Sequence, residues 1–273
     1  MKRFLLRTPK GSLLLVFLPL LVLGASVAGW SLVVPHVLAA LAGACLTELA
    51  IARFDRRPLT WPTSALLSGA IVAFVLSPQT PLIVTAVVGL LATISKHLVA
   101  GRRGHIFNPA ALALLISIPL FATGQSWWGA LPDLAWPCLI VLLVGGSWIV
   151  DRLNKFPLVL TFLFAYFGLF TLVGLSDPTR VAEMFRAPFA QSAVFLALFM
   201  LTDPPTSPSR ERDQVWIGAL VAAVSCLSYL LGVGQAFLLV GLLAGNVALA
   251  CRRVWPVRAA QRPLASGAAK GRA

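Results

Sequence analysis

The sequence predicts an all-α polytopic membrane protein with about ten transmembrane helices. Of its 273 residues, 59% are hydrophobic and only 11% are charged, and the mean hydropathy is +0.89. A soluble domain of this length needs more polar surface than this composition supplies. The first apolar run lacks a small-residue cleavage site and others follow it, so we interpret it as a membrane helix rather than a cleaved signal peptide.

Ten apolar segments separated by turns or basic stretches define the expected helices. Their approximate bounds are 12–31, 34–53, 64–77, 81–100, 109–122, 135–150, 157–175, 191–202, 214–232 and 234–251. A full span needs about 20 residues, and the third, fifth and eighth segments fall well short of that length. We therefore expect these three to be discontinuous or tilted.

The placement of basic residues supports ten crossings. If the amino terminus is cytoplasmic, all of the 22 Lys and Arg except Arg180 and Arg186 fall inside or at an inner helix end, as the positive-inside rule requires. The net charge of +13 then reflects topology and anionic inner-leaflet lipid. No aromatic and basic module supports a nucleic-acid partner. We expect a multi-pass protein of the bacterial cytoplasmic (inner) membrane, with both termini cytoplasmic.

The expected organisation is a single membrane domain over 1–273. It comprises a basic N-terminus (1–11), a first half (12–122), a second half (135–251) and a basic tail (252–273). The tail serves as an inner-face anchor or as a docking site for a partner.

Two polar breaks interrupt the apolar sequence, at residues 101–110 (the first break) and 201–208 (the second break). Unsatisfied polar groups in hydrocarbon cost several kcal/mol each, so broken helices persist where they line a cavity or bind something. Asn108 before Pro109, and Asp203 before Pro204, have the order of an N-cap and a first helical residue. Helices beginning there would aim free N–H groups at an anion or an electron-rich ring edge. One break in each half is also how inverted-repeat transporters build a midplane site.

Ionisable residues within or beside apolar segments are His36, Glu48, Lys96 and Asp203. Such residues mark a functional site or an internal pair. Glu48 lies about five residues, or about 7 Å, inside the inner end of its segment. It either takes part in function or pairs with Lys96 or Arg102 to orient helices.

The histidines and cysteines point to no metal or haem centre. His36, His97 and His105 are scattered, and we assign none of them to the site. The four cysteines lie singly in or beside apolar runs, which is typical of packing residues. Haem and zinc sites need facing or closely spaced ligands.

Several sequence blocks follow one another in the order of a known family. They are Ser64-Ala-Leu-Leu-Ser-Gly-Ala70, Leu76-Ser-Pro-Gln-Thr-Pro81, Ser95-Lys96, Gly101 to Gly104, Phe107-Asn-Pro-Ala-Ala111 and Phe199-Met-Leu-Thr-Asp-Pro-Pro-Thr-Ser-Pro208. From about Ala44 to Asn246 the chain therefore resembles the RnfD/NqrB family, the membrane flavin subunits of the Rnf complex and of the sodium-pumping NADH:quinone reductase.

The resemblance implies a bundle of ten helices in two inverted five-helix halves, similar to urea transporters. It also implies a non-covalent flavin (riboflavin or FMN) or a quinone at the breaks, and ion coupling through Glu48 and Asp203. The residues expected to hold the ring are Lys96, Phe107, Asn108, Pro109, Thr202 and Asp203.

One departure concerns covalent FMN. Family members that carry it use a threonine of a Ser-Gly-Ala-Thr type sequence in the outward loop after the Phe-Asn-Pro-Ala helix. Here that loop, 123–133, has no such motif, and Ser68-Gly-Ala-Ile71 has isoleucine where threonine is required. Thr123 is the only threonine in the loop. Covalent FMN is therefore not expected.

Three functions remain open at this point. The first is a membrane electron-transfer subunit, an oxidoreductase or translocase component that passes electrons through the bound ring. Because the chain has no nucleotide-binding fingerprint or iron-sulfur ligand set, it would need a separate soluble or membrane-associated reductase and other complex subunits. The second is a small-solute channel or carrier with a urea-transporter-like cavity and no redox role. The third is a non-catalytic assembly subunit.

The ten-crossing topology predicts that reporter fusions after Asp133 and Asp177 report an outside location, because both positions follow outward crossings. Fusions at the termini should report a cytoplasmic location. A cytoplasmic signal at either aspartate would rule out this helix count.

Overall fold

The computed structural model of the chain describes residues 8–101, 104–133 and 139–260, and most of them are helical. In chain order the longer helices are α2 (Pro9–Ala28), α3 (Trp30–Phe54), α4 (Thr63–Val75), α5 (Leu82–Leu98), α6 (Pro109–Phe121), α7 (Leu139–Leu153), α8 (Phe156–Ser176), α10 (Phe189–Phe195), α11 (Glu211–Leu230) and α12 (Phe237–Ala260). Shorter turns of helix are η1 (Trp128–Ala130), α9 (Pro178–Val181), η3 (Ala182–Phe185), η4 (Leu196–Met200) and η5 (Gly234–Ala236). Strands β1 (Ala100–Gly101) and β2 (Gly104–His105) form a small antiparallel pair.

Each of the ten apolar segments overlaps one of these longer helices, with the π-helical η4 continuing α10. Among the described residues, five helical stretches are long and apolar enough to cross a membrane: Pro9–Ala28, Trp30–Phe54, Phe156–Ser176, Glu211–Leu230 and Gly234–Arg253. The chain is therefore a helical, multi-pass membrane protein.

The other helices are short. Helices α4 and α6 have 13 residues each, and α10 has seven residues before the five of η4, as expected for the third, fifth and eighth segments. Helices α5 and α7, with 17 and 15 residues, are also shorter than a full span, which the sequence did not single out. Part of the expected sixth segment, 135–138, lies outside the described residues.

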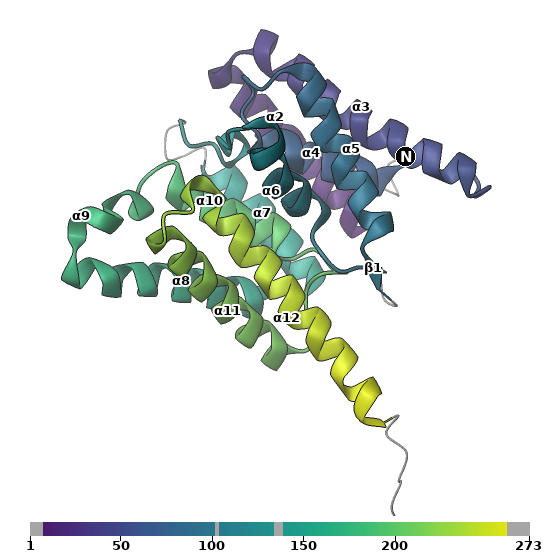
Figure 1. The fold of residues 1–273 in the computed structure, drawn as a ribbon. Helices are drawn as coiled ribbons and strands as arrows, with labels where there is room; N and C mark the ends of the chain where they lie inside the picture. The colour runs from purple at the N-terminus through teal and green to yellow at the C-terminus, as the bar shows by residue number, and fades with distance from the viewer. Residues whose placement is uncertain (1–7, 102–103, 134–138, 261–273) are drawn as a thin grey trace, which may run out of the picture.

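The closest helix pairs are α3 with α5 and α8 with α11, which run side by side at opposite edges of the molecule (Figure 1). Glycines let these backbones touch, as is typical of membrane helices. A Cβ added to Gly43 of α3 would overlap the carbonyl oxygen of Ala86. One added to Gly218 of α11 would lie 2.7 Å from the carbonyl oxygen of Leu158.

Extended backbone follows α4 and α6 at their carboxyl ends. Leu76 and Gln125 form an isolated antiparallel bridge, and the Ser77 N–H donates to the Gly124 carbonyl at 3.0 Å. A turn follows, in which the Thr80 N–H donates to the Ser77 carbonyl at 3.0 Å. The pairing satisfies backbone groups that two short helices leave open inside an apolar bundle.

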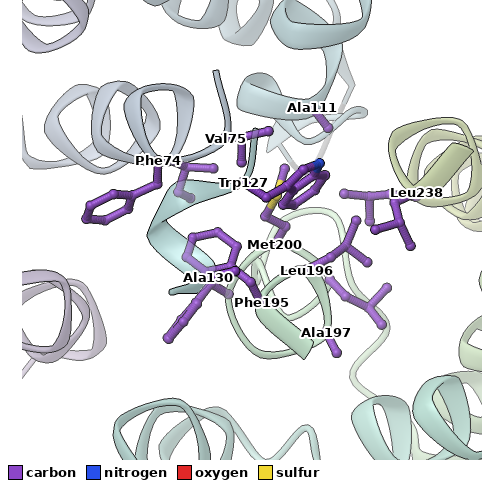
Figure 2. Packing of buried hydrophobic residues seen from close by; sticks show 14 of the residues in the cluster. Phe74, Val75, Ala111, Trp127, Ala130, Phe195, Leu196, Ala197, Met200 and Leu238 are labelled. Atoms are coloured by element: carbon purple, nitrogen blue, oxygen red, sulfur yellow. The ribbon is translucent and has the colours of Figure 1, made fainter. Parts of the chain in front are cut away.

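An aromatic cluster fills the centre of the bundle. Figure 2 shows Phe74, Trp127 and Phe195 there among other buried side chains. The ring of Phe195 lies 5.0 Å from that of Phe199 and 6.3 Å from that of Trp127, measured between centroids. Aromatic pairs at these separations stabilise a core beyond the area they bury.

The α3–α5 contact predicts that Gly43→Val lowers the free energy of unfolding by about 3 kcal/mol or more, because the new side chain would meet backbone rather than a movable side chain. Gly168→Val on α8 is the matched control, since nothing lies within 4 Å of its Cβ position. Thermal unfolding in detergent measures both variants. Equal losses would show that the cost comes from changing a helical glycine and not from the contact.

Candidate functional site

The two breaks meet at one cavity of about 250 Å³. Its walls also include the amino ends of α2 and α4 and the carboxyl ends of α5 and α7. Apolar side chains form most of the lining, including Leu13, Leu67, Ile71, Ile149, Leu153 and Phe199, and polar groups come from Lys10, Ser64, Ser68, Lys96, His105, Asn108, Thr202 and Asp203. The cavity therefore combines an apolar interior with a few converging polar groups, as is typical of ligand sites.

Asn108 begins α6 as the sequence predicted. Its Oδ1 accepts from the Ala111 N–H at 3.1 Å, and Pro109 is the first helical residue. Its Nδ2 donates to the Met200 carbonyl at 3.0 Å, and its own N–H donates to Oδ1 of Asn246 at 2.8 Å. Asn108 lines the cavity, but both ends of its side-chain amide hold protein groups rather than facing a ligand unpartnered.

The second break departs from the expected helix start at Asp203. No helix begins after Pro204; the chain turns, with the Thr206 N–H donating to the Asp203 carbonyl at 3.1 Å, and α11 starts at Glu211. Prolines at 204, 205 and 208 remove N–H donors and disfavour helical backbone in the residues before them. The Asp203 side chain caps no helix, and its Oδ2 accepts from Oγ1 of Thr206 at 3.0 Å.

His105 joins the first break to the second. Its Nε2 lies 3.1 Å from Oδ2 of Asp203, and both side chains line the cavity. The sequence analysis did not assign this histidine to the site, and the structure places it at the cavity wall beside the carboxylate. A histidine and carboxylate pair at a cavity wall can bind, orient and exchange protons.

Lys96, near the end of α5, reaches into the same cavity. Its Nζ donates to the Ser64 carbonyl at 2.8 Å and lies 3.3 Å from the Ser64 Oγ. The ammonium is close enough to interact with the charges of Asp203 and Glu48. The cavity thus has a cation on one wall and a carboxylate on another.

Thr202 and Phe107, which were also expected to hold the ring, contribute no free polar group to the cavity. Thr202 lines the cavity, but only 1% of it is exposed and its Oγ1 donates to the Leu198 carbonyl at 2.8 Å. Phe107 does not line the cavity; it is half-buried and packs against the hydrophobic core. Thr202 and Phe107 therefore shape the break rather than present polar groups to the cavity.

Glu48 lies in a neighbouring cavity of about 350 Å³. Its Oε2 is 3.2 Å from Nε2 of His97, so the internal partner is His97 rather than Lys96. The other partner considered, Arg102, lies outside the described residues. Lys10 and Ser64 line both cavities, which therefore adjoin.

His36, which the sequence analysis assigned to no site, lies inside the protein. It is fully buried in α3, and its Nδ1 lies 3.2 Å from Oγ1 of Thr85 on α5. Its place in the α3–α5 contact makes it a packing residue, and it does not line the cavity between the breaks.

Comparison with known proteins now identifies the family. A model of the NQR2, RnfD, RnfE family matches residues 6–136 and 128–251, which is most of the chain. This chain belongs to the NQR2, RnfD, RnfE family. A curated relative, the D component of the ion-translocating oxidoreductase complex of Aliivibrio salmonicida (strain LFI1238), is 36% identical over 102 residues. That match covers 35% of this chain and 29% of the relative, so the aligned part is less than a third of the relative's length.

In this family member the loop that follows α6 keeps its threonine buried. Thr123 is 9% exposed, and its Oγ1 is 2.7 Å from Oγ of Ser117. The loop borders an outer cavity of about 310 Å³, whose lining includes Gln125 and Trp127 but not Thr123. In the part of the chain that the structure describes, no three His, Cys, Asp or Glu side chains gather as metal ligands.

Sequence reasoning missed Asn246, which links the two breaks. It is 4% exposed in α12; its Oδ1 accepts from the Asn108 N–H, and its Nδ2 donates to the Thr206 carbonyl at 3.2 Å. The sequence did contain one signal for this role. Asn246 is a polar residue within an apolar segment, and such a residue needs hydrogen-bonding partners inside the protein.

The network around Asn108 predicts that Asn108→Leu lowers the free energy of unfolding by about 2–6 kcal/mol, because the Ala111 N–H and the Met200 carbonyl would each lose a partner. Removing the N-cap of α2 by Thr8→Ala, where a proline also follows the cap, should cost only about 0.5–2 kcal/mol. Thermal unfolding of the two variants tests the difference. Equal small losses would mean that Asn108 acts as a cap alone.

Proposed function

We propose that this chain is the membrane subunit of an ion-translocating oxidoreductase complex and holds a flavin or quinone ring non-covalently in the cavity between the two breaks. The observation that carries the proposal is the cavity itself, which draws polar groups from both breaks around an apolar interior. Family membership and the name of the bacterial relative support the complex.

The size and lining of the cavity fit a ring rather than a whole dinucleotide. Ligand sites commonly span about 300–1,000 Å³, and this cavity of about 250 Å³ lies below that range. Leu67, Ile149 and Phe199 would cover the faces of a planar ring. Ring oxygens and nitrogens would meet the polar groups at the edge.

The polar residues divide the work of binding. The Lys96 ammonium would bind a ring oxygen and stabilise negative charge that develops on it. His105, oriented by Asp203, would hold or deliver a proton at its other ring nitrogen. A bound flavin or quinone would supply the electron-accepting chemistry, while the chain binds the ring, orients it and excludes water.

The loop after α6 supports a non-covalent ligand. The hydroxyl of Thr123 already contacts Ser117 and lies away from the outer cavity. No other threonine occurs in that loop. These observations support a ligand that is held without a covalent bond to this loop.

Ion coupling would involve two carboxylates in adjoining cavities. Asp203 contacts His105 and Glu48 contacts His97, and Lys96 lies close enough to interact with both carboxylates. A change of charge on the ring would alter its electrostatic interaction with Lys96, and through Lys96 it would affect both carboxylate–histidine pairs. This arrangement gives a physical route from electron transfer to ion or proton uptake.

The proposed fold consists of ten spans in two inverted halves within one domain. Support comes from the matching pairs α3–α5 and α8–α11 and from one break in each half. We place the protein in the bacterial inner membrane with cytoplasmic termini, beside a soluble or membrane-associated reductase that supplies electrons. Both breaks and the amino end of α2 then face the cytoplasmic side.

The solute-carrier alternative meets an obstacle in the aromatic cluster. Phe199 lines the inner cavity and Trp127 lines the outer one, and Phe195 packs between them with centroid distances of 5.0 and 6.3 Å. These rings occupy the space that a solute would cross. The same rings do not hinder electron transfer, which needs no open path.

The proposal predicts that purified protein shows a flavin or quinone absorbance band that denaturation releases from the chain, leaving no fluorescent band in a denaturing gel. Lys96→Met and Asp203→Asn should each weaken binding of added riboflavin or ubiquinone-1 by about tenfold or more, because each removes a charged hydrogen-bonding group. His97→Gln, next to Lys96 but outside the cavity, is the matched control. A colourless, folded protein that binds neither riboflavin nor ubiquinone-1 would contradict the proposal and favour solute transport.

A further inference from the structure

The carbonyl groups of the second break are held by side chains from distant parts of the chain. Arg253 of α12 donates to the Pro205 and Ser207 carbonyls at 2.8 and 3.1 Å. The Thr206 carbonyl between them accepts from Asn246. The Pro208 carbonyl accepts from Nζ of Lys155, at the start of α8. Four successive carbonyls are thus satisfied from outside the break.

Two of these three donors are cations. Lys155 is only 6% exposed. Burial lowers the pKa of its ammonium, the charge of Arg253 lowers it further, and Asp203 partly offsets both. Burying a cation beside another cation is unfavourable unless strong acceptors surround it. The carbonyls of the second break are such acceptors, so the break and its cations depend on each other.

A row of carbonyls outside a helix is also the arrangement with which broken membrane helices coordinate metal cations. In this chain, tethered guanidinium and ammonium groups contact those oxygens. Neither Arg253 nor Lys155 lines the ring-sized cavity, so neither can touch a ligand there. Both contact the backbone of the segment that carries Asp203.

We propose that Arg253 and Lys155 are positioning residues that act as built-in cations of the second break, fixing the loop that carries Asp203 without a bound ion at those carbonyls. The inference deepens the proposed function, because the loop forms one wall of the candidate site. It does not depend on which ligand the cavity binds.

The test measures how often the loop opens. Ser207 is 3% exposed, so a Ser207→Cys thiol should react slowly with a water-soluble maleimide in a full-length chain whose four native cysteines are replaced by serine or alanine. Arg253→Gln and Lys155→Met should each raise the labelling rate by about tenfold or more, because loss of charged donors favours local opening. Arg252→Gln is the matched control, since Arg252 pairs with Asp213 at 2.7 Å and contributes no hydrogen bond to the loop.

Chemical rescue separates a local clamp from general loosening. Methylguanidinium added to Arg253→Ala should slow labelling towards the parent rate, and choline at the same ionic strength should not. Labelling of Arg253→Gln and Lys155→Met at the control rate would overturn the proposal, and so would fast labelling of Arg253→Ala that methylguanidinium leaves unchanged. Because no ring ligand is present, failure here is distinct from failure of the ligand-binding test.

Discussion

Backbone polar groups at the two breaks need partners, and the rest of the site depends on how they are supplied. A helix normally satisfies its own N–H and carbonyl groups, but residues around Asn108 and Asp203 lie outside regular helix in a bundle built for an apolar solvent. The partners come from side chains. Asn108 reaches Met200 across the bundle, and Asn246 contacts both breaks at once. The cavity is the space that remains around these cross-links.

Much of the architecture follows from local sequence. Ten apolar segments locate ten helices, because length and hydropathy are properties of each segment alone. The cap at Asn108 and Pro109 is also local, and it was predicted correctly. The same residue order at Asp203 and Pro204 predicted a helix start, and that prediction was wrong. The prolines that follow disfavour a helix, and the chain turns instead. The family could also be inferred from short sequence blocks such as Phe107-Asn-Pro-Ala-Ala111, and the family match over most of the chain confirms that inference.

The contacts that define the candidate site could not be predicted, because they join residues far apart in the chain. His105 and Asp203 are separated by 98 positions, and neither neighbourhood specifies the other. Glu48 had several plausible basic partners, and helix packing selects His97. The sequence placed Arg253 in a basic tail that was interpreted as an anchor or a docking site. Only the fold shows that its guanidinium donates hydrogen bonds to carbonyls of the second break.

The amide of Asn246 has a consequence for the function proposed for the site. Because one side chain binds both breaks, the two walls of the cavity cannot separate without breaking buried hydrogen bonds. In the proposed function, the dipoles around a bound ring would therefore stay in place when its charge changes. Fixed dipoles keep the reorganisation energy of a charge-transfer step low. A large rocking motion would raise that energy, so a cavity whose two walls are joined by this asparagine suits the proposed transfer of electrons better than the movement of solutes.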